Sequence, residues 1–124
     1  MKINLTDAEW KLMPPLWEQT PRTIMELTAA VREETGWSKN TVITMLSRLE
    51  AKGAVRHEEG ERAKQYYPLI QREEAARAET ETFLSKVYGG SLGLMMSAMV
   101  DSHSLTEEDI AQLSAILDKA KEGS

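Results

Sequence analysis

The sequence of 124 residues predicts a mainly α-helical protein that contains one small β-hairpin. Three observations lead to this fold class. Apolar residues recur at helical spacing behind capping residues as far as Gly53. Short β-compatible runs then follow around Gly60, and helical spacing returns after residue 70. We therefore expect one compact domain over residues 1–70 and a helical extension over residues 71–124.

The first helix is predicted to begin at Thr6. Thr6 and Glu9 have the spacing of a capping box, in which each side chain accepts a hydrogen bond from the other residue's backbone N–H. Apolar residues follow at helical spacing as far as Trp17. Pro14 and Pro15 lie inside this pattern and lack a backbone donor, so we expect the helix to end or kink just before them and to continue only weakly.

Two more helices are predicted before the hairpin. A second capping box, Thr23 with Glu26, begins a helix that Gly36 ends. Ser38 is the expected N-cap of the third helix, and Gly53 ends it. Four apolar residues of the third helix have the spacing of a buried face: Val42, Met45, Leu46 and Leu49. Six others are expected away from the core: Asn40, Thr41, Ile43, Thr44, Ser47 and Arg48.

The segment after Gly53 predicts a β-hairpin. Its strands are expected at residues 54–57 and 63–69, joined by a charged turn around Gly60. Pro68 has no backbone N–H, so the second strand should end near this residue or lie at an edge of the sheet.

Three further helices are predicted after the hairpin. They lie at residues 71–88, at residues 91–100 and from Thr106 onward, where Thr106 and Asp109 cap the last helix. Each is apolar on one side only, and a second copy of the chain is the simplest cover for these sides. The residues expected to form this dimer contact are Phe83, Leu84, Val87, Tyr88, Leu94, Met95, Val100, Ile110, Leu113 and Leu117.

The formal net charge is −5, but the charge is unevenly distributed. Residues 1–70 contain ten Lys or Arg and ten Asp or Glu, so their net charge is 0, whereas residues 71–124 contain five and ten, giving −5. Residues 38–56 contain four basic residues and one acidic residue, giving +3. A local basic surface with an acidic extension is compatible with phosphate binding by one face.

Three compact helices followed by a hairpin is the order of a winged helix-turn-helix domain, whose third helix enters the major groove of DNA. Short hydroxyl and amide groups beside an arginine suit phosphates and base edges. The expected DNA contacts are Ser38, Lys39, Asn40, Thr41, Ile43, Thr44, Ser47, Arg48, Arg56, Arg62 and Lys64. Glu58, Glu59 and Glu61 lie in the same hairpin and would repel phosphates. The alternative to DNA binding is a winged helix that docks other proteins.

Other classes of function receive little support. The chain has no cysteine, and its two histidines, His57 and His103, lie in different predicted parts, so we expect no enzyme, no metal and no cofactor. We expect a cytoplasmic protein, since the first residues lack a signal-peptide pattern and no apolar stretch approaches the roughly 20 residues of a membrane span. Met95, Met96 and Met99 indicate interface packing, and a small effector bound beside them is the other interpretation.

The run WSKNTVITMLSRLEAKGAV, residues 37–55, has LTDAEWKLMPPLW before it and GERAKQYYPL after it. This combination resembles the penicillinase-repressor family (BlaI/MecI/CopY type) of bacterial transcription regulators, from residue 5 to about residue 117. The resemblance implies a homodimer whose winged helices bind a palindromic operator in double-stranded DNA and whose C-terminal helices hold the partner chain. By position, Thr41, Thr44 and Arg48 fall where the family's recognition helix meets DNA.

The sequence also departs from this family. Asn40 and Ile43 stand where members often have a lysine and a polar or aromatic residue, so the operator sequence stays open. Ala98 and Met99 occupy the place of the Asn-Phe bond that a protease cleaves in β-lactam-responsive members, and the cysteine cluster of the copper-responsive branch is missing. The resemblance therefore leaves an unknown effector or sensor protein as the expected inducer.

Overall fold

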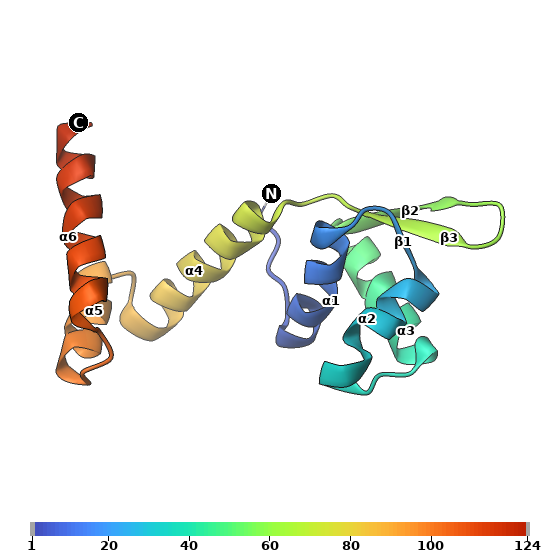
Figure 1. Cartoon of the computed structure of the whole chain (residues 1–124), viewed down its shortest axis with the longest axis horizontal. Coiled ribbons are helices and arrows are strands. Elements are labelled where there is room, and N and C mark those ends of the chain that lie inside the picture. The colour runs from blue at the N-terminus through green and yellow to red at the C-terminus, as the bar shows by residue number, and fades with distance from the viewer. Residues whose placement is uncertain (1, 124) are drawn as a thin grey trace. The chain divides into compact units, whose positions relative to one another are not determined.

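The computed structural model describes residues 2–123, which form two compact units, the first ending at Thr80 and the second beginning at Glu81 (Figure 1). The first unit contains α1 (Asp7–Glu18), β1 (Arg22–Thr23), α2 (Ile24–Thr35), α3 (Lys39–Ala51), β2 (Val55–Glu59), β3 (Lys64–Pro68) and the first turns of α4 (Arg72–Tyr88). The second unit contains the rest of α4, α5 (Leu92–Asp101) and α6 (Glu107–Glu122). The predicted mainly α-helical fold with a β-hairpin is confirmed.

The start of α4 belongs to the first unit, although the first domain was predicted to end at residue 70. Ala75 and Ala78 are buried in this part of the chain, and Ala75 is part of the hydrophobic core. Arg72 lies over the ring of Trp17, with 5.0 Å between the guanidinium carbon and the ring centroid. These contacts attach the first turns of α4 to the helices that precede the hairpin.

The expectation that the first helix could end before the prolines is wrong, because α1 is one continuous helix with Pro14 and Pro15 inside it. An interior proline costs a helix about 3 kcal/mol. On the other side of α1, Leu12, Met13 and Leu16 are completely buried, and burial of each such side chain contributes about 1.5–3 kcal/mol. Packing against the core therefore offsets the cost of the two prolines. The capping box of Thr6 is present as predicted.

The hairpin is part of a three-stranded antiparallel sheet with the order β1-β3-β2 (Figure 1). The two residues of β1 pair with β3, Arg22 opposite Tyr66 and Thr23 opposite Gln65. Pro68 is the last residue of β3, so the prediction that this strand ends there is confirmed, while the alternative of an edge strand is wrong. A strand of two residues is too short to show a period in the sequence, which is why β1 was missed.

The core of the first unit is formed by the buried faces of α1, α2 and α3 together with the base of the sheet. The predicted third-helix residues are all buried: Val42, Met45, Leu46 and Leu49. Trp17 lies at the edge of this core, where its indole Nε1 donates a hydrogen bond of 2.9 Å to the carbonyl oxygen of Ile70. The third helix is thus held with a fixed face outward.

The second unit has the predicted helices but little core of its own. Thr106 and Asp109 form the capping box of α6, as expected. Neither α5 nor α6 contains a buried residue. In the part of the chain that the structure describes, these two helices therefore lack the buried face that stabilises a helix in a globular domain.

Candidate nucleic-acid interface

The outer face of α3 is polar and accessible. Ser38 caps the helix by accepting a hydrogen bond of 3.2 Å from the backbone N–H of Thr41. Thr41 and Ile43 are partly buried at the margin of this face. The six exposed residues of the face are Ser38, Lys39, Asn40, Thr44, Ser47 and Arg48. The same helix therefore buries an apolar stripe and presents amide, hydroxyl and cationic groups on its other side.

Three hydroxyl groups of this face, those of Ser38, Thr41 and Thr44, already take part in local hydrogen bonds. Ser38 Oγ is the helix cap and lies 3.2 Å from Thr41 Oγ1. Thr44 donates its hydroxyl hydrogen to the carbonyl oxygen of Asn40 over 3.1 Å. The Thr44 oxygen keeps a lone pair that can accept a further hydrogen bond. Among the described residues, no group forms a hydrogen bond with the side chain of Asn40 or of Ser47. Asn40 and Ser47 are thus the side chains of this face that are available to both donate and accept.

One of the three hairpin cations expected to contact DNA is paired within the hairpin. Arg56 Nη1 lies 2.8 Å from Glu58 Oε1, and the Arg56 guanidinium lies 4.1 Å above the ring of Tyr67. Arg56 in turn holds the pKa of the Glu58 carboxyl below its usual value, first by its hydrogen bond and then by its charge. Residues i and i+2 of a strand share a face, so this pair could have been found in the sequence.

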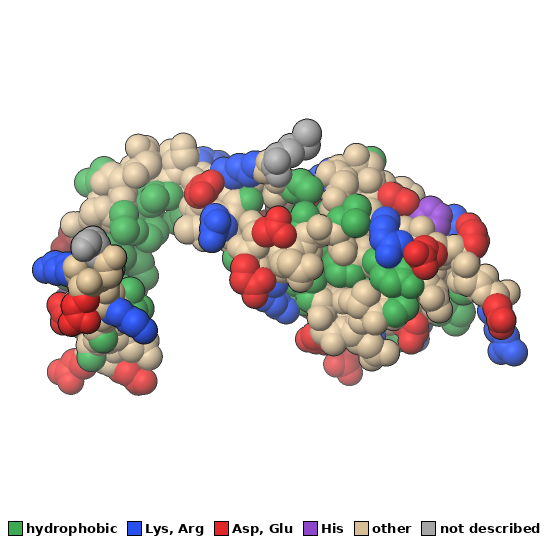
Figure 2. Space-filling view, turned by 90° about the horizontal axis from the view of Figure 1, so that it is seen from above, with side chains coloured by type: hydrophobic (Ala, Val, Ile, Leu, Met, Phe, Trp, Pro, Cys, Tyr) green, Lys and Arg blue, Asp and Glu red, His purple; other side chains and the backbone are tan. Residues whose placement is uncertain are grey.

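Arg62 and Lys64 are exposed near the tip of the hairpin. Side chains of both charge signs gather at this tip, on the right of Figure 2. The acidic residues of the turn are therefore close neighbours of the two cations that were expected to contact DNA.

Lys52 is one of the four basic residues that give residues 38–56 a net charge of +3, but its side chain is not part of the outer face of α3. Its Nζ lies 2.6 Å from Glu9 Oε1 and donates a second hydrogen bond of 2.9 Å to the carbonyl oxygen of Asn4. The Glu9 side chain is only 2% exposed. Glu9 and Lys52 are far apart in the sequence, so no local pattern predicted this internal ion pair, which ties the end of α3 to the start of α1.

His57 joins the hairpin to α3. Its Nδ1 lies 2.7 Å from Glu50 Oε2, and its ring packs against Tyr66 with 5.5 Å between the centroids. Burial, followed by the charges of Glu50 and Glu59, raises the pKa of the Tyr66 hydroxyl. The described residues contain no group of three or more side chains able to hold a metal ion.

The second unit exposes many of the apolar residues that were expected to form a dimer contact. Green side chains show at the surface of this part, on the left of Figure 2. Those about half exposed are Phe83, Val87, Leu94, Val100, Ile110 and Leu117, while Leu84, Tyr88, Met95 and Leu113 are partly buried. Leu92 and Ile116 are equally exposed and were missed, because they lie beside the stripes that were assigned from helical spacing.

A groove of about 390 Å³ runs between α5 and α6. Met95, Met96 and Met99 line it together with Leu113 and Ile116. The methionines thus lie together on one apolar surface, as either packing or an effector site requires. Within residues 2–123, no helix has the length and apolar character needed to cross a membrane.

Comparison with known proteins agrees with this arrangement. The family model for penicillinase repressors matches residues 5–119. A penicillinase repressor of Bacillus licheniformis is 30% identical over 118 residues, which cover 95% of this chain and 92% of that protein. The methicillin resistance regulatory protein MecI of Staphylococcus aureus is 25% identical over 116 residues, covering 94% of each chain.

Solved structures show the same fold. The solution structure of the DNA-binding domain of the repressor BlaI has a TM-score of 0.52 and 32% identity, covering 60% of this chain and 93% of that one. The solution structure of monomeric Bacillus licheniformis BlaI in complex with the blaP half-operator has a TM-score of 0.50 and 29% identity. The match covers 58% of this chain and 93% of that one. The reduced form of Escherichia coli MarR has a similar fold, with a TM-score of 0.50 and 21% identity over 94% of this chain and 77% of that one. The predicted winged helix-turn-helix fold is confirmed, and the chain belongs to the penicillinase repressor family.

Proposed function

We propose that this protein is a transcriptional repressor that binds a palindromic DNA operator as a homodimer. In this proposal α3 enters the major groove and the β2-β3 hairpin lies along the phosphate backbone. The outer face of α3 carries the proposal, because it combines exposed hydroxyl and amide groups with two cations, Lys39 and Arg48. The relative BlaI has been solved in complex with a half-operator, which supports the same use of this surface.

The side chains of this surface are proposed to play different parts in DNA binding. Asn40, Thr44, Ser47 and Arg48 face outward from α3 and are placed to reach base edges. Ser38, Thr41 and Ile43 complete this surface at its margin. Lys39, Arg62 and Lys64 supply charge for phosphates. We assign Arg56 a smaller part, since Glu58 neutralises its charge and Tyr67 covers one face of its guanidinium.

Dimerisation is proposed to occur through the second unit. Its helices α5 and α6 bury no residue in the single chain, while several of their leucine and isoleucine side chains are more than half exposed. Exposed apolar surface of this kind is unfavourable in water and typical of a protein–protein contact. An isologous contact between two copies would cover it and would place two α3 helices on one operator.

The operator can be found by selection from a library of random DNA duplexes with the full chain. We expect an enriched palindrome and two chains for each duplex in analytical ultracentrifugation. Arg48→Gln should weaken binding to the selected duplex about tenfold or more, while the matched control Arg77→Gln, an exposed arginine of α4, should not. Enrichment of no sequence, or equal effects of both variants, would favour the protein-docking alternative.

Repression is proposed to end without cleavage of the chain. Ala98 and Met99 lie inside α5, so a protease could bind this segment in extended form only after local unfolding. A ligand or sensor protein that prefers the DNA-free dimer would instead shift the binding equilibrium. We propose a cytoplasmic location, where the chain can reach DNA. The test is the intact mass of the protein in cells before and during induction: a fragment that appears before transcription rises would contradict this proposal.

A further inference from the structure

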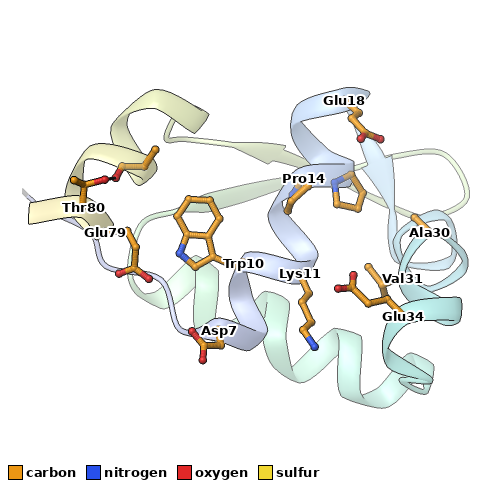
Figure 3. Close-up of a pocket in the computed structure, with 12 residues that line it drawn as sticks. Asp7, Trp10, Lys11, Pro14, Glu18, Ala30, Val31, Glu34, Glu79 and Thr80 are labelled. Atoms are coloured by element: carbon orange, nitrogen blue, oxygen red, sulfur yellow. Dashed lines mark hydrogen bonds between the residues drawn. The ribbon is translucent and has the colours of Figure 1, made fainter. Parts of the chain in front are cut away.

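A cleft in the first unit lies apart from every residue proposed to contact DNA. It is formed by α1, α2 and the first turns of α4 and has a volume of about 820 Å³ (Figure 3). Small-molecule sites usually have volumes of about 300–1,000 Å³. The cleft is therefore large enough for a small organic ligand.

The α1 side of the cleft is largely apolar and includes the two prolines of this helix. Trp10, Pro14 and Pro15 line it, and Val31 and Ala76 continue the apolar surface from α2 and α4. Pro14 and Pro15 have no backbone N–H, so neither the third nor the fourth residue after Lys11 can donate to the Lys11 carbonyl oxygen. The residues that interrupt the hydrogen bonding of α1 are thus the ones that line the cleft.

The rim of the cleft is negatively charged. Asp7, Glu18, Glu34 and Glu79 line it with a single cation, Lys11, so the lining carries a formal charge of −3. In the described part of the chain, none of these five side chains lies in an ion pair. Unpaired carboxylates around an apolar surface attract organic cations and repel anions.

Trp10 adds two further features. Its indole Nε1 is buried and has no hydrogen-bond partner among the described residues, so it is a donor that the chain itself does not satisfy. An indole ring also attracts a cation placed over its face more strongly than other aromatic rings do. Figure 3 shows Trp10 between α1 and α4, on the side of the cleft where Glu79 lies.

We propose that this cleft binds a lipophilic organic cation. The ligand's apolar groups would lie on the prolines and Val31, and its positive charge would face Trp10 and the carboxylates. This site differs in place and in chemistry from the methionine-lined groove of the second unit, which has no comparable ring of carboxylates.

The test uses two probes of nearly equal size and opposite charge, tetraphenylphosphonium and tetraphenylborate. Each is titrated into the full chain by isothermal titration calorimetry, and the site is located from amide shifts in two-dimensional NMR. We expect the phosphonium ion to bind once per chain and to shift the amides of Ala30, Glu34 and Thr80. The borate ion should not bind there.

Matched variants separate the cleft from general surface charge. Glu34→Gln and Glu79→Gln should each weaken phosphonium binding about two- to fivefold, the range for one exposed charge pair. Glu33→Gln and Glu73→Gln remove exposed carboxylates from the same two helices outside the cleft and should leave binding unchanged. All four are conservative changes, and a urea unfolding curve of each confirms that it is folded.

Three results would overturn the proposal. Equal binding of the two probes would show that charge does not select the ligand. Equal loss in the cleft and control variants would show attraction by overall charge only. Amide shifts confined to α5 and α6 would show that the phosphonium ion binds the exposed apolar surface of the second unit instead.

Discussion

Lys52→Met is expected to destabilise the protein while leaving its contacts with DNA intact. Lys52 bonds both Glu9 and the Asn4 carbonyl oxygen, and its loss leaves the buried Glu9 carboxylate with the 2.8 Å bond from the Thr6 backbone N–H. Removing one partner of a fully buried ion pair costs about 3–5 kcal/mol. The Lys52 side chain is 31% exposed, so we expect the smaller loss of about 1.5–3 kcal/mol typical of a charged hydrogen bond.

The assay is urea unfolding followed by tryptophan fluorescence. With a slope of about 1 kcal/mol per molar urea for a small domain, the midpoint should fall by about 1.5–3 M. The double variant with Glu9→Gln measures the coupling, and it should be less destabilised than the sum of the single changes. Lys39→Met is the matched control, since Lys39 is exposed on the outer face of α3 and should change stability little.

Binding to the selected operator as a function of salt completes the test. Each phosphate contact contributes about 0.9 to the slope of log affinity against log salt. Lys39→Met should reduce the slope by about 0.9 per chain, whereas Lys52→Met should leave it unchanged. If Lys52→Met reduces the slope and leaves the urea midpoint where it was, Lys52 is a phosphate contact and the internal ion pair contributes little.

Four further predictions concern α3, the cap of α2 and the second unit. Thr44→Ala should cost about 1–3 kcal/mol in operator binding with little change in the urea midpoint, and an equal loss in both would indicate a packing role. Ile43→Gln should change base preference at one position of each half-site, which selection from a random library detects; an unchanged preference would remove this residue from base readout. Hydrogen bonds from Thr23, first from its backbone and then from its hydroxyl, lower the pKa of Glu26. The ionised Glu26 therefore stabilises the fold at pH values above the ordinary glutamate pKa of about 4.3. This contribution is lost as the pH falls through the lowered pKa. The stability difference between wild type and Glu26→Gln should therefore shrink in urea curves from pH 7 to pH 3, and a constant difference would contradict this role. A chain ending at Thr80 should stay folded, be monomeric in ultracentrifugation and bind the operator about 10²–10⁴-fold more weakly, and undiminished binding would refute dimerisation through the second unit.

Interactions between residues close together in the sequence could be predicted from the sequence alone. Capping boxes join residues three positions apart, and those of Thr6, Thr23 and Thr106 are all present where the spacing predicted them. The buried stripe of α3 was equally predictable, because helical geometry alone places residues i, i+3, i+4 and i+7 on one side. The outer face of α3 followed as the remaining residues of the same helix.

The tertiary structure decided the features that depend on contacts between distant segments. The two-residue strand β1 exists because β3 supplies its hydrogen bonds, and α1 continues through Pro14 because its other side is buried. The ion pair of Lys52 with Glu9 places in an internal contact one of the four cations that the sequence counted in the basic stretch of residues 38–56. Such contacts join residues more than forty positions apart, and their free energy depends on burial that only the folded chain provides, so no local pattern in the sequence can reveal them.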